Sequence, residues 1–194
     1  MRITVLMSLM ILLSMTSVDR GRSLPVQVTQ QSSPAVAQSG QIKITIATSG
    51  GPYPGPAKDS FRVGESVPLV ITMTNTGSQP VYVCESDSLY QDRPRLLRDG
   101  QPFPYKSYRQ DMLQLSERDA TCKDEDLPQQ TLLRPNEPTV VDWSNLGQGR
   151  NSLNDDGWYE PLPVGKYTLT DRRRLTCCDG PFIESNTINF VVTP

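Results

Sequence analysis

Residues 61–77 constrain the fold of this chain more strongly than any other stretch. Their large apolar side chains recur at every second position, which is the period of a strand that buries one face in a core. These side chains belong to Val67, Leu69, Ile71 and Met73. Turn-forming residues at 75–78 and a second short apolar run at 80–84 follow. We therefore predict a central strand here, joined to the next strand by a hairpin or by a crossover to another sheet.

Alternating apolar and polar residues predict strands in most of the remaining chain. The further candidate strands are residues 42–47, 94–98, 101–103, 131–134, 139–143, 166–175 and 187–193. Asp99-Gly100, between two of them, is a strong signal for a tight hairpin. The runs are short, turn signals separate them, and no long helix is available. We therefore predict an all-β fold: an immunoglobulin-like antiparallel β-sandwich of about seven to nine strands.

Two aromatic side chains are predicted to fill the core. Strict alternation in residues 139–143 puts Trp143 on the same face as Val141, and a tryptophan can fill much of a small core. Tyr167 comes directly after a Pro/Gly turn, where Greek-key sandwiches often place a core tyrosine. We expect both side chains to be buried.

One part of the domain lacks strand character. Residues 105–130 are mostly polar, and Met112, Leu113 and Leu115 lie among Gln, Glu and Arg residues. This pattern favours one or two helical turns. We interpret the stretch as a polar insertion packed on one end of the sandwich.

The first residues have the pattern of an export signal. Arg2 precedes an apolar run, residues 3–15, that is shorter than the roughly 20 residues of a spanning helix. We predict a cleaved signal peptide at residues 1–23 and an exported protein, periplasmic or secreted. An uncleaved anchor is the alternative, favoured by basic residues after the run. Residues 24–40, rich in Gln, Ser and Pro, are predicted to be a flexible tether to the domain, residues 41–194.

The charge of the chain argues against a nucleic acid as partner. The chain has 19 basic and 21 acidic residues, and removal of residues 1–23 takes away three basic and one acidic residue, leaving a net charge of −4. Nucleic acids need a concentrated basic face. The one basic run, Arg172-Arg173-Arg174, is short, and we interpret it as a solvated strand edge. We also expect no stable membrane span after signal cleavage.

The composition removes most catalytic chemistries. The chain has no histidine, which excludes Ser-His and Cys-His catalysis and the commonest zinc ligand. No phosphate-binding glycine loop occurs. The acidic runs at 124–126 and 155–156 are interpreted as solvated loop charge rather than as carboxylates facing each other across a cleft. We therefore predict no catalytic residue, no bound metal and no cofactor, and we expect that the chain is not an enzyme.

Three aromatic residues are candidates for contact with a partner. Tyr53 is the one aromatic residue in the loop 49–60, which is crowded with glycine and proline. Trp158 and Tyr159 follow the polar loop 144–157 and could form a platform for a sugar. A plain connecting loop, and a Trp buried at a strand entrance, are the alternatives.

A set of turn and core motifs occurs in a recognisable order over most of residues 61–170. The set consists of the 67–75 strand, Gly77-Ser78-Gln79-Pro80-Val81, the Asp99-Gly100 hairpin, Leu133-Arg134-Pro135-Asn136-Glu137 leading to Trp143, and Leu162-Pro163-Val164-Gly165-Lys166-Tyr167-Thr168-Leu169. This order resembles the bacterial immunoglobulin-like sandwich of the intracellular proteinase inhibitor type. The resemblance implies the sandwich fold and inhibition of a protease. The chain departs from that type by its export signal, by the insertion, and by Asn136 where a turn glycine is usual.

Two functions of different class follow. The first is an exported, non-enzymatic binding or structural module of the bacterial envelope or exterior, whose loops contact a protein or a glycan. The second is a proteinase inhibitor that inserts an exposed loop, such as 50–57 or 144–158, into a protease cleft.

The four cysteines are predicted to form two disulfides, because an exported chain meets an oxidising compartment. Three pairings of Cys84, Cys122, Cys177 and Cys178 are possible. One joins the neighbours Cys177 and Cys178 in a strained ring, and the other two pair these neighbours with Cys84 and Cys122. We favour the latter, because an immunoglobulin-like order brings the strand of Cys84 beside the strand that ends near Cys177. Four thiolates around zinc are the competing use.

Non-reducing peptide mapping of the exported protein should therefore find no free thiol. Cys84 should be joined to one of Cys177 and Cys178, and Cys122 to the other. Each bridge should contribute about 2–4 kcal/mol to stability, so reduction should lower the melting temperature. Four free thiols, or a bond between Cys177 and Cys178, would contradict the arrangement.

Overall fold

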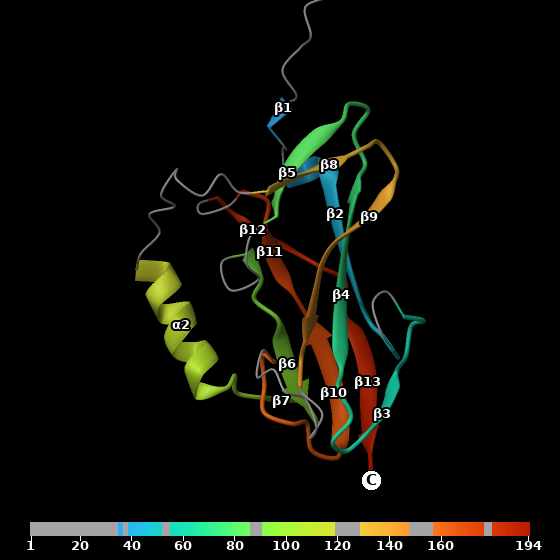
Figure 1. Cartoon of the computed structure of the whole chain (residues 1–194), viewed down its shortest axis with the longest axis vertical. Coiled ribbons are helices and arrows are strands. Elements are labelled where there is room, and N and C mark those ends of the chain that lie inside the picture. The colour runs from blue at the N-terminus through green and yellow to red at the C-terminus, as the bar shows by residue number, and fades with distance from the viewer. Residues whose placement is uncertain are drawn as a thin grey trace, which may run out of the picture. The chain divides into compact units, whose positions relative to one another are not determined.

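The computed structural model describes residues 35–36, 39–51, 55–85, 91–118, 129–147, 157–176 and 180–194, all within the unit Ser33–Pro194. The described residues form thirteen strands, one 3-10 helix and one α-helix (Figure 1). Most strand pairs are antiparallel. The fold is therefore mostly β, as the alternating pattern predicts.

The predicted central strand lies in the middle of a three-stranded antiparallel sheet. The order of this sheet is β2 (Ile42–Thr48), β4 (Pro68–Asn75) and β9 (Pro138–Asn145). Val67, Leu69, Ile71 and Met73 are all buried, so the predicted core face is confirmed. In β2, Ile42, Ile44 and Ile46 face the same core.

A second sheet has five strands. Their order is β3 (Ser60–Arg62), β13 (Ile188–Thr193), β10 (Gly165–Thr170), β6 (Arg95–Arg98) and β7 (Gln101–Pro102). The pairing of β3 with β13 is parallel, and the other pairings are antiparallel. Asp99 and Gly100 connect β6 to β7 with φ angles of 49° and 82°. Positive φ at both positions is typical of a two-residue hairpin turn, so the predicted hairpin is confirmed.

Two smaller sheets complete the strands. One consists of β1 (Ala35–Val36), β5 (Val81–Glu85) and β8 (Gln129–Leu133), and the other of β11 (Arg172–Arg174) and β12 (Phe182–Glu184). Because β5 does not pair with β4, the connection between them is a crossover. Ala35 and Val36 pair with Val81 and Tyr82, so this part of the predicted tether is a strand. The predicted strand 166–175 is divided at Asp171 into β10 and β11.

The sheets share one hydrophobic core. Buried side chains of β2, β4, β5, β10 and β13 belong to a single cluster. Asn186 links the turn before β13 to the edge of β2, because its side chain accepts a hydrogen bond from the Ile46 N–H (2.7 Å) and donates one to the Ile46 carbonyl (3.2 Å). Tyr167 is buried, as predicted, and its hydroxyl donates to the Pro163 carbonyl at 2.6 Å.

The prediction that Trp143 is a core residue is wrong, and a β-bulge is the reason. Ile71 pairs with Asp142 and Thr72 with Val140, so Val141 is an extra residue in β9. A bulge re-aims the side chains that follow it. Val141 and Asp142 therefore both point toward the interior, and Trp143 is turned outward with 37% of its surface exposed.

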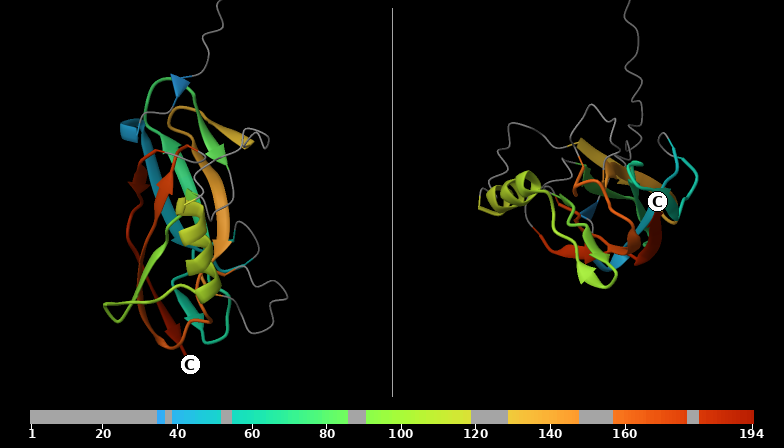
Figure 2. Two further views of the ribbon diagram at one scale, coloured as in Figure 1. Left: turned by 90° about the vertical axis from the view of Figure 1, so that its left-hand side faces the viewer. Right: turned by 90° about the horizontal axis from the view of Figure 1, so that it is seen from below.

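The predicted insertion contains a longer helix than its sequence suggests. The helix α2 (Ser107–Arg118) has 12 residues, about three turns. It runs alongside the strands in Figure 1 and in the left view of Figure 2. Arg109 and Leu113 are buried on it. The 3-10 helix η1 (Ser39–Gln41) precedes β2. Within the described ranges, no helix combines the length and the hydropathy needed to cross a membrane.

The two tryptophans of the chain should differ sharply in their effect on stability. Trp158 is fully buried, whereas Trp143 lies on the outer face of β9. Trp158→Ala should lower the free energy of unfolding by about 3–5 kcal/mol. Trp143→Ala should cost on the order of 1 kcal/mol. Urea unfolding of both variants measures the difference, and equal losses would contradict the bulge in β9.

Candidate functional site

A buried cluster of charged side chains is centred on Arg173, which is paired with two carboxylates. From 167 to 175 every second residue is buried, and this face consists of Tyr167, Leu169, Asp171, Arg173 and Leu175. Arg173 therefore points into the interior and is fully buried. The interpretation of the arginine run as a solvated edge is wrong for this residue. The continuous alternation from Tyr167 is the sequence signal that could have revealed it.

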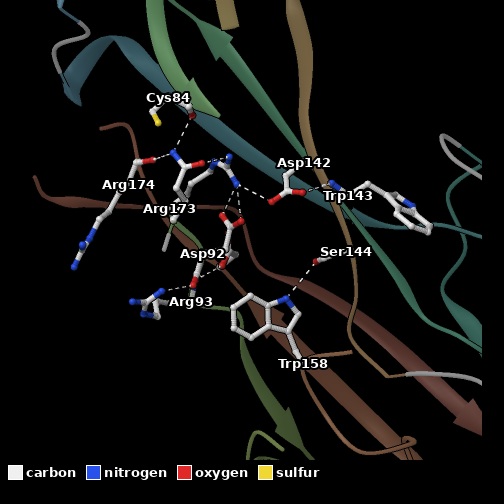
Figure 3. Close-up of polar contacts among 11 residues, drawn as sticks. Cys84, Asp92, Arg93, Asp142, Trp143, Ser144, Trp158, Arg173 and Arg174 are labelled. Atoms are coloured by element: carbon white, nitrogen blue, oxygen red, sulfur yellow. Dashed lines mark hydrogen bonds and ion pairs between the residues drawn. The ribbon is translucent and has the colours of Figure 1, made fainter. Parts of the chain in front are cut away.

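The guanidinium of Arg173 is held by acceptors from two other segments (Figure 3). Its Nη1 donates to both carboxylate oxygens of Asp92, at 2.7 and 2.6 Å, and to Asp142 Oδ2 at 3.1 Å. Its Nη2 donates to Gln91 Oε1 at 2.9 Å. We call these four residues the Arg173 network. A buried charge is tolerated when it is paired and hydrogen-bonded in this way.

The backbone brings the members of the network together. Asp92 and Arg173 form an antiparallel bridge, and the bulge in β9 aims Asp142 inward. The Gln91 side chain also donates to the Cys84 carbonyl at 2.8 Å, and the Cys84 N–H donates to the Leu175 carbonyl at 2.9 Å. The network therefore connects β5, β9 and β11.

A third carboxylate lies beside the network. Asp171 is fully buried, and its Oδ1 accepts a hydrogen bond from the Arg93 N–H at 3.0 Å. Burial raises the pKa of Asp171 to about 6, although the Arg93 N–H and the charge of Arg173 oppose the shift. Burial also raises the pKa of Asp92 well above its usual range, against the attraction of Arg173. Both carboxyls therefore hold a proton more readily than exposed ones.

The chemistry of the network is structural. Arg173 and Asp92 are 0% and 1% exposed, so a substrate has no route to either group. Among the described residues no group of three or more His, Cys, Asp or Glu side chains could hold a metal ion. The carboxylates surround a guanidinium instead. The network thus works as a brace between strands.

The predicted exposed platform of Trp158 and Tyr159 is wrong, because both side chains are buried. The backbone N–H of Trp158 donates to the Asn145 carbonyl (2.9 Å), and the backbone carbonyl of Trp158 accepts from the Lys106 N–H (3.0 Å). This segment is therefore enclosed between β9 and the residues just before α2. The indole Nε1 donates to Ser144 Oγ at 3.3 Å. The Tyr159 hydroxyl donates to the Pro94 carbonyl at 2.6 Å.

The remaining predicted site residues are only partly described. Cys84 is buried, and its sulfur is bonded in a disulfide. Cys122, Cys177 and Cys178 lie outside the described residues, so the pairing stays a prediction. Leu175, which accepts a hydrogen bond from Cys84, is two positions before Cys177. Tyr53 also lies outside the described residues.

The outer face of α2 carries an apolar stripe that the sequence interpretation missed. Tyr108 and Leu115 are 61% and 51% exposed, the largest values among the exposed large apolar side chains of the described residues. Met112, half-buried, lies between them at the spacing i, i+4, i+7, so the three residues share one side of the helix. We call them the α2 stripe. Their spacing is visible in the sequence, but one or two helical turns, as predicted, are too short to place all three residues on one helix.

In comparisons with known proteins, no family model matches the chain, and no curated protein is found to match it. The functional interpretation therefore rests on the residues of this chain.

Asp171 should make the free energy of unfolding depend on pH between about 4 and 6. Its pKa is about 6 in the folded chain against an ordinary value of 3.8, so over this range the folded state keeps a proton that the unfolded state has lost. Its contribution to stability is complete below pH 3.8 and disappears as the pH rises to 6. Asp171→Asn mimics the protonated carboxyl. It should flatten this dependence and stabilise the protein at pH 7 by at most about 3 kcal/mol.

Urea unfolding at a series of pH values measures this effect. Glu65→Gln is a control, because Glu65 should change the free energy of unfolding with pH in the opposite direction. The hydrogen bond from Lys58 lowers the pKa of Glu65. Its stabilisation is present above its unfolded-state pKa and is lost as the pH falls. If wild type and Asp171→Asn show the same slope between pH 4 and 6, the assignment to Asp171 is wrong.

Proposed function

We propose that this chain is an exported, non-enzymatic binding module of the bacterial envelope or exterior. In this proposal the strands form an immunoglobulin-like antiparallel β-sandwich, and side chains on its surface hold a partner. Export is inferred from the signal-like residues 1–23. The disulfide at Cys84 is in keeping with an oxidising compartment.

The immunoglobulin-like architecture is favoured by its core and by one corner. The two larger sheets contribute to one hydrophobic cluster, as the layers of a sandwich do. Tyr167 lies near the start of β10, and its hydroxyl donates to a carbonyl four residues upstream. A tyrosine with such a bond is a hallmark of this fold class.

A non-enzymatic role is favoured by the enclosure of the ionisable groups. The chain has no histidine, and Arg173 and Asp92, the central ion pair of the Arg173 network, are sealed from solvent. Their hydrogen bonds are made to one another rather than directed at a cleft. The rigidity that such a brace provides suits a scaffold that presents a contact surface.

The observation that carries the binding role is the α2 stripe. Two large apolar side chains on one side of this helix are more than half exposed, and a partner that covered them would gain free energy by removing this surface from water. An amphipathic helix with anchors at i, i+4 and i+7 is a common recognition element for a hydrophobic groove. We therefore expect a protein partner to contact Tyr108 and Leu115.

The full chain should lose its partner when the α2 stripe is made polar. Tyr108→Ser combined with Leu115→Ser is compared with Gln110→Ser combined with Gln114→Ser, a matched control at two exposed polar positions of the same helix. Each chain is used to recover proteins from the envelope and medium of the producing cells, and recovery is quantified by mass spectrometry. Wild type and control should recover the same protein, and the stripe variant at least tenfold less.

Equal recovery by all three chains, or no specific protein with wild type, would contradict the proposal. The proteinase inhibitor remains the alternative function. Parts of its candidate loops, residues 52–54 and 148–156, lie outside the described residues, so it stays a prediction. It would be favoured by recovery of a protease whose activity falls when the full chain is added.

A further inference from the structure

A shallow hollow lies on the outward face of the five-stranded sheet, where β3, β13 and β10 run side by side (Figure 1). It is open to solvent and has a volume of about 420 Å³. This volume is within the range of small-molecule sites, about 300–1,000 Å³. The exposed and half-buried side chains that line the hollow are those of Asp59, Lys166, Thr168, Asn189 and Val191. None of them belongs to the Arg173 network or to the α2 stripe.

The register of the strands fixes the positions of these side chains. Lys166 pairs with Val191, and Thr168 pairs with Asn189, across β10 and β13. The residues between them in each strand are buried, so these four side chains point outward. On the other side of β13, the Val191 N–H donates to the Asp59 carbonyl at 2.9 Å. Val191 therefore lies between Lys166 and Asp59.

The hollow has a positive end and a negative end. The ion pairs of the described residues involve neither Lys166 nor Asp59. Adjacent strands are about 4.8 Å apart, so the two outer strands that hold these charges are separated by about 10 Å. Asp99 lies beside Lys166, but its carboxylate accepts from the Lys166 backbone N–H at 3.0 Å and pairs with Arg98 at 3.7 Å.

The floor between the two charges offers a further donor. The Thr168 hydroxyl donates to Asn189 Oδ1 at 2.8 Å, which orients the amide and leaves its Nδ2 group directed elsewhere as a donor. Asn189 is the diagonal neighbour of Lys166 across the two strands, so both side chains can reach one carboxylate. Val191 contributes an apolar surface between this pair of donors and Asp59.

We propose that this hollow binds a short zwitterion, an amino acid or a dipeptide. The carboxylate of the ligand accepts hydrogen bonds from Lys166 and Asn189, and its ammonium group donates to Asp59. Hydrogen bonds between charged groups are about twice as strong as those between neutral ones. A hydrogen bond of about 2.8 Å at each end leaves roughly 4 Å of the 10 Å span for the ligand. One or two residues fit this gap, because a residue extends the chain by at most about 3.5 Å.

Titration of the isotope-labelled full chain with dialanine, followed by NMR, tests the site. Wild type should show saturable shifts of the backbone amides of β10 and β13. N-acetyl-dialanine lacks the ammonium and dialanine amide lacks the carboxylate, so each should bind at least tenfold more weakly. Lys43→Gln is the matched control, because Lys43 is an exposed lysine of β2 in the other large sheet. It should keep the wild-type affinity.

Two variants assign the two ends of the ligand. Asp59→Asn should weaken dialanine at least tenfold and should abolish the preference for dialanine over N-acetyl-dialanine. Lys166→Gln should have the same effect on affinity and should abolish the preference for dialanine over dialanine amide. A loss of structure would not remove one preference and keep the other. Both side chains are exposed, so both variants should fold.

The proposal is overturned if dialanine gives no saturable shifts, or if both blocked peptides bind as tightly as dialanine. It is also overturned if the folded variants keep both preferences. If a variant unfolds, the comparison of the three peptides on wild type decides by the same tenfold criterion. The hollow and the α2 stripe have no residue in common, so either proposal can fail alone.

Discussion

The buried guanidinium of Arg173 is the constraint on which much of the surrounding structure depends. Moving a charge out of water costs several kcal/mol, so the fold must supply acceptors for its terminal nitrogens. Asp92, Asp142 and Gln91 fulfil this role, and they come from parts of the chain far apart in sequence. Removing one acceptor leaves an uncompensated buried charge, which typically costs about 3–5 kcal/mol. Two irregular features, the bulge in β9 and the bridge at Asp92, serve this one side chain.

The elements that could be predicted from the sequence are those whose signals are local. The alternation around Ile71 and the Asp99-Gly100 turn depend only on neighbouring residues, and both appear in the structure as expected. Trp143 could not be placed in this way, because the bulge that turns it outward also aims Asp142 at Arg173 in another strand. The prediction that Trp158 is exposed was wrong for a similar reason, because its burial depends on α2. Arg109 of this helix packs over Trp158, with the guanidinium carbon 5.3 Å from the centroid of the ring. Tertiary packing overrode local pattern at both positions.

The α2 stripe and the inward position of Arg173 were missed for a different reason, since each was visible as a spacing. Tyr108, Met112 and Leu115 fit one side of a helix only if the helix is long enough to include all three. The interpretation of the arginine run as one solvated edge overlooks that a strand places adjacent residues on opposite faces. The middle arginine then belongs to the interior and the outer two to the surface. The same sequence run therefore contributes to the brace and to the contacts with the Phe182 ring.

This division of one run between two faces also couples the interior to the surface. Arg172 and Arg174 can approach Phe182 only while β11 keeps its register with β12, and that register is held from the inside by Arg173 and its bond to Asp92. Gln91 extends the connection to the backbone of the disulfide-bonded Cys84. Burial raises the pKa values of Asp92 and Asp171, so the attraction of Arg173 and the hydrogen bonds around it must offset the cost of keeping these buried carboxylates charged.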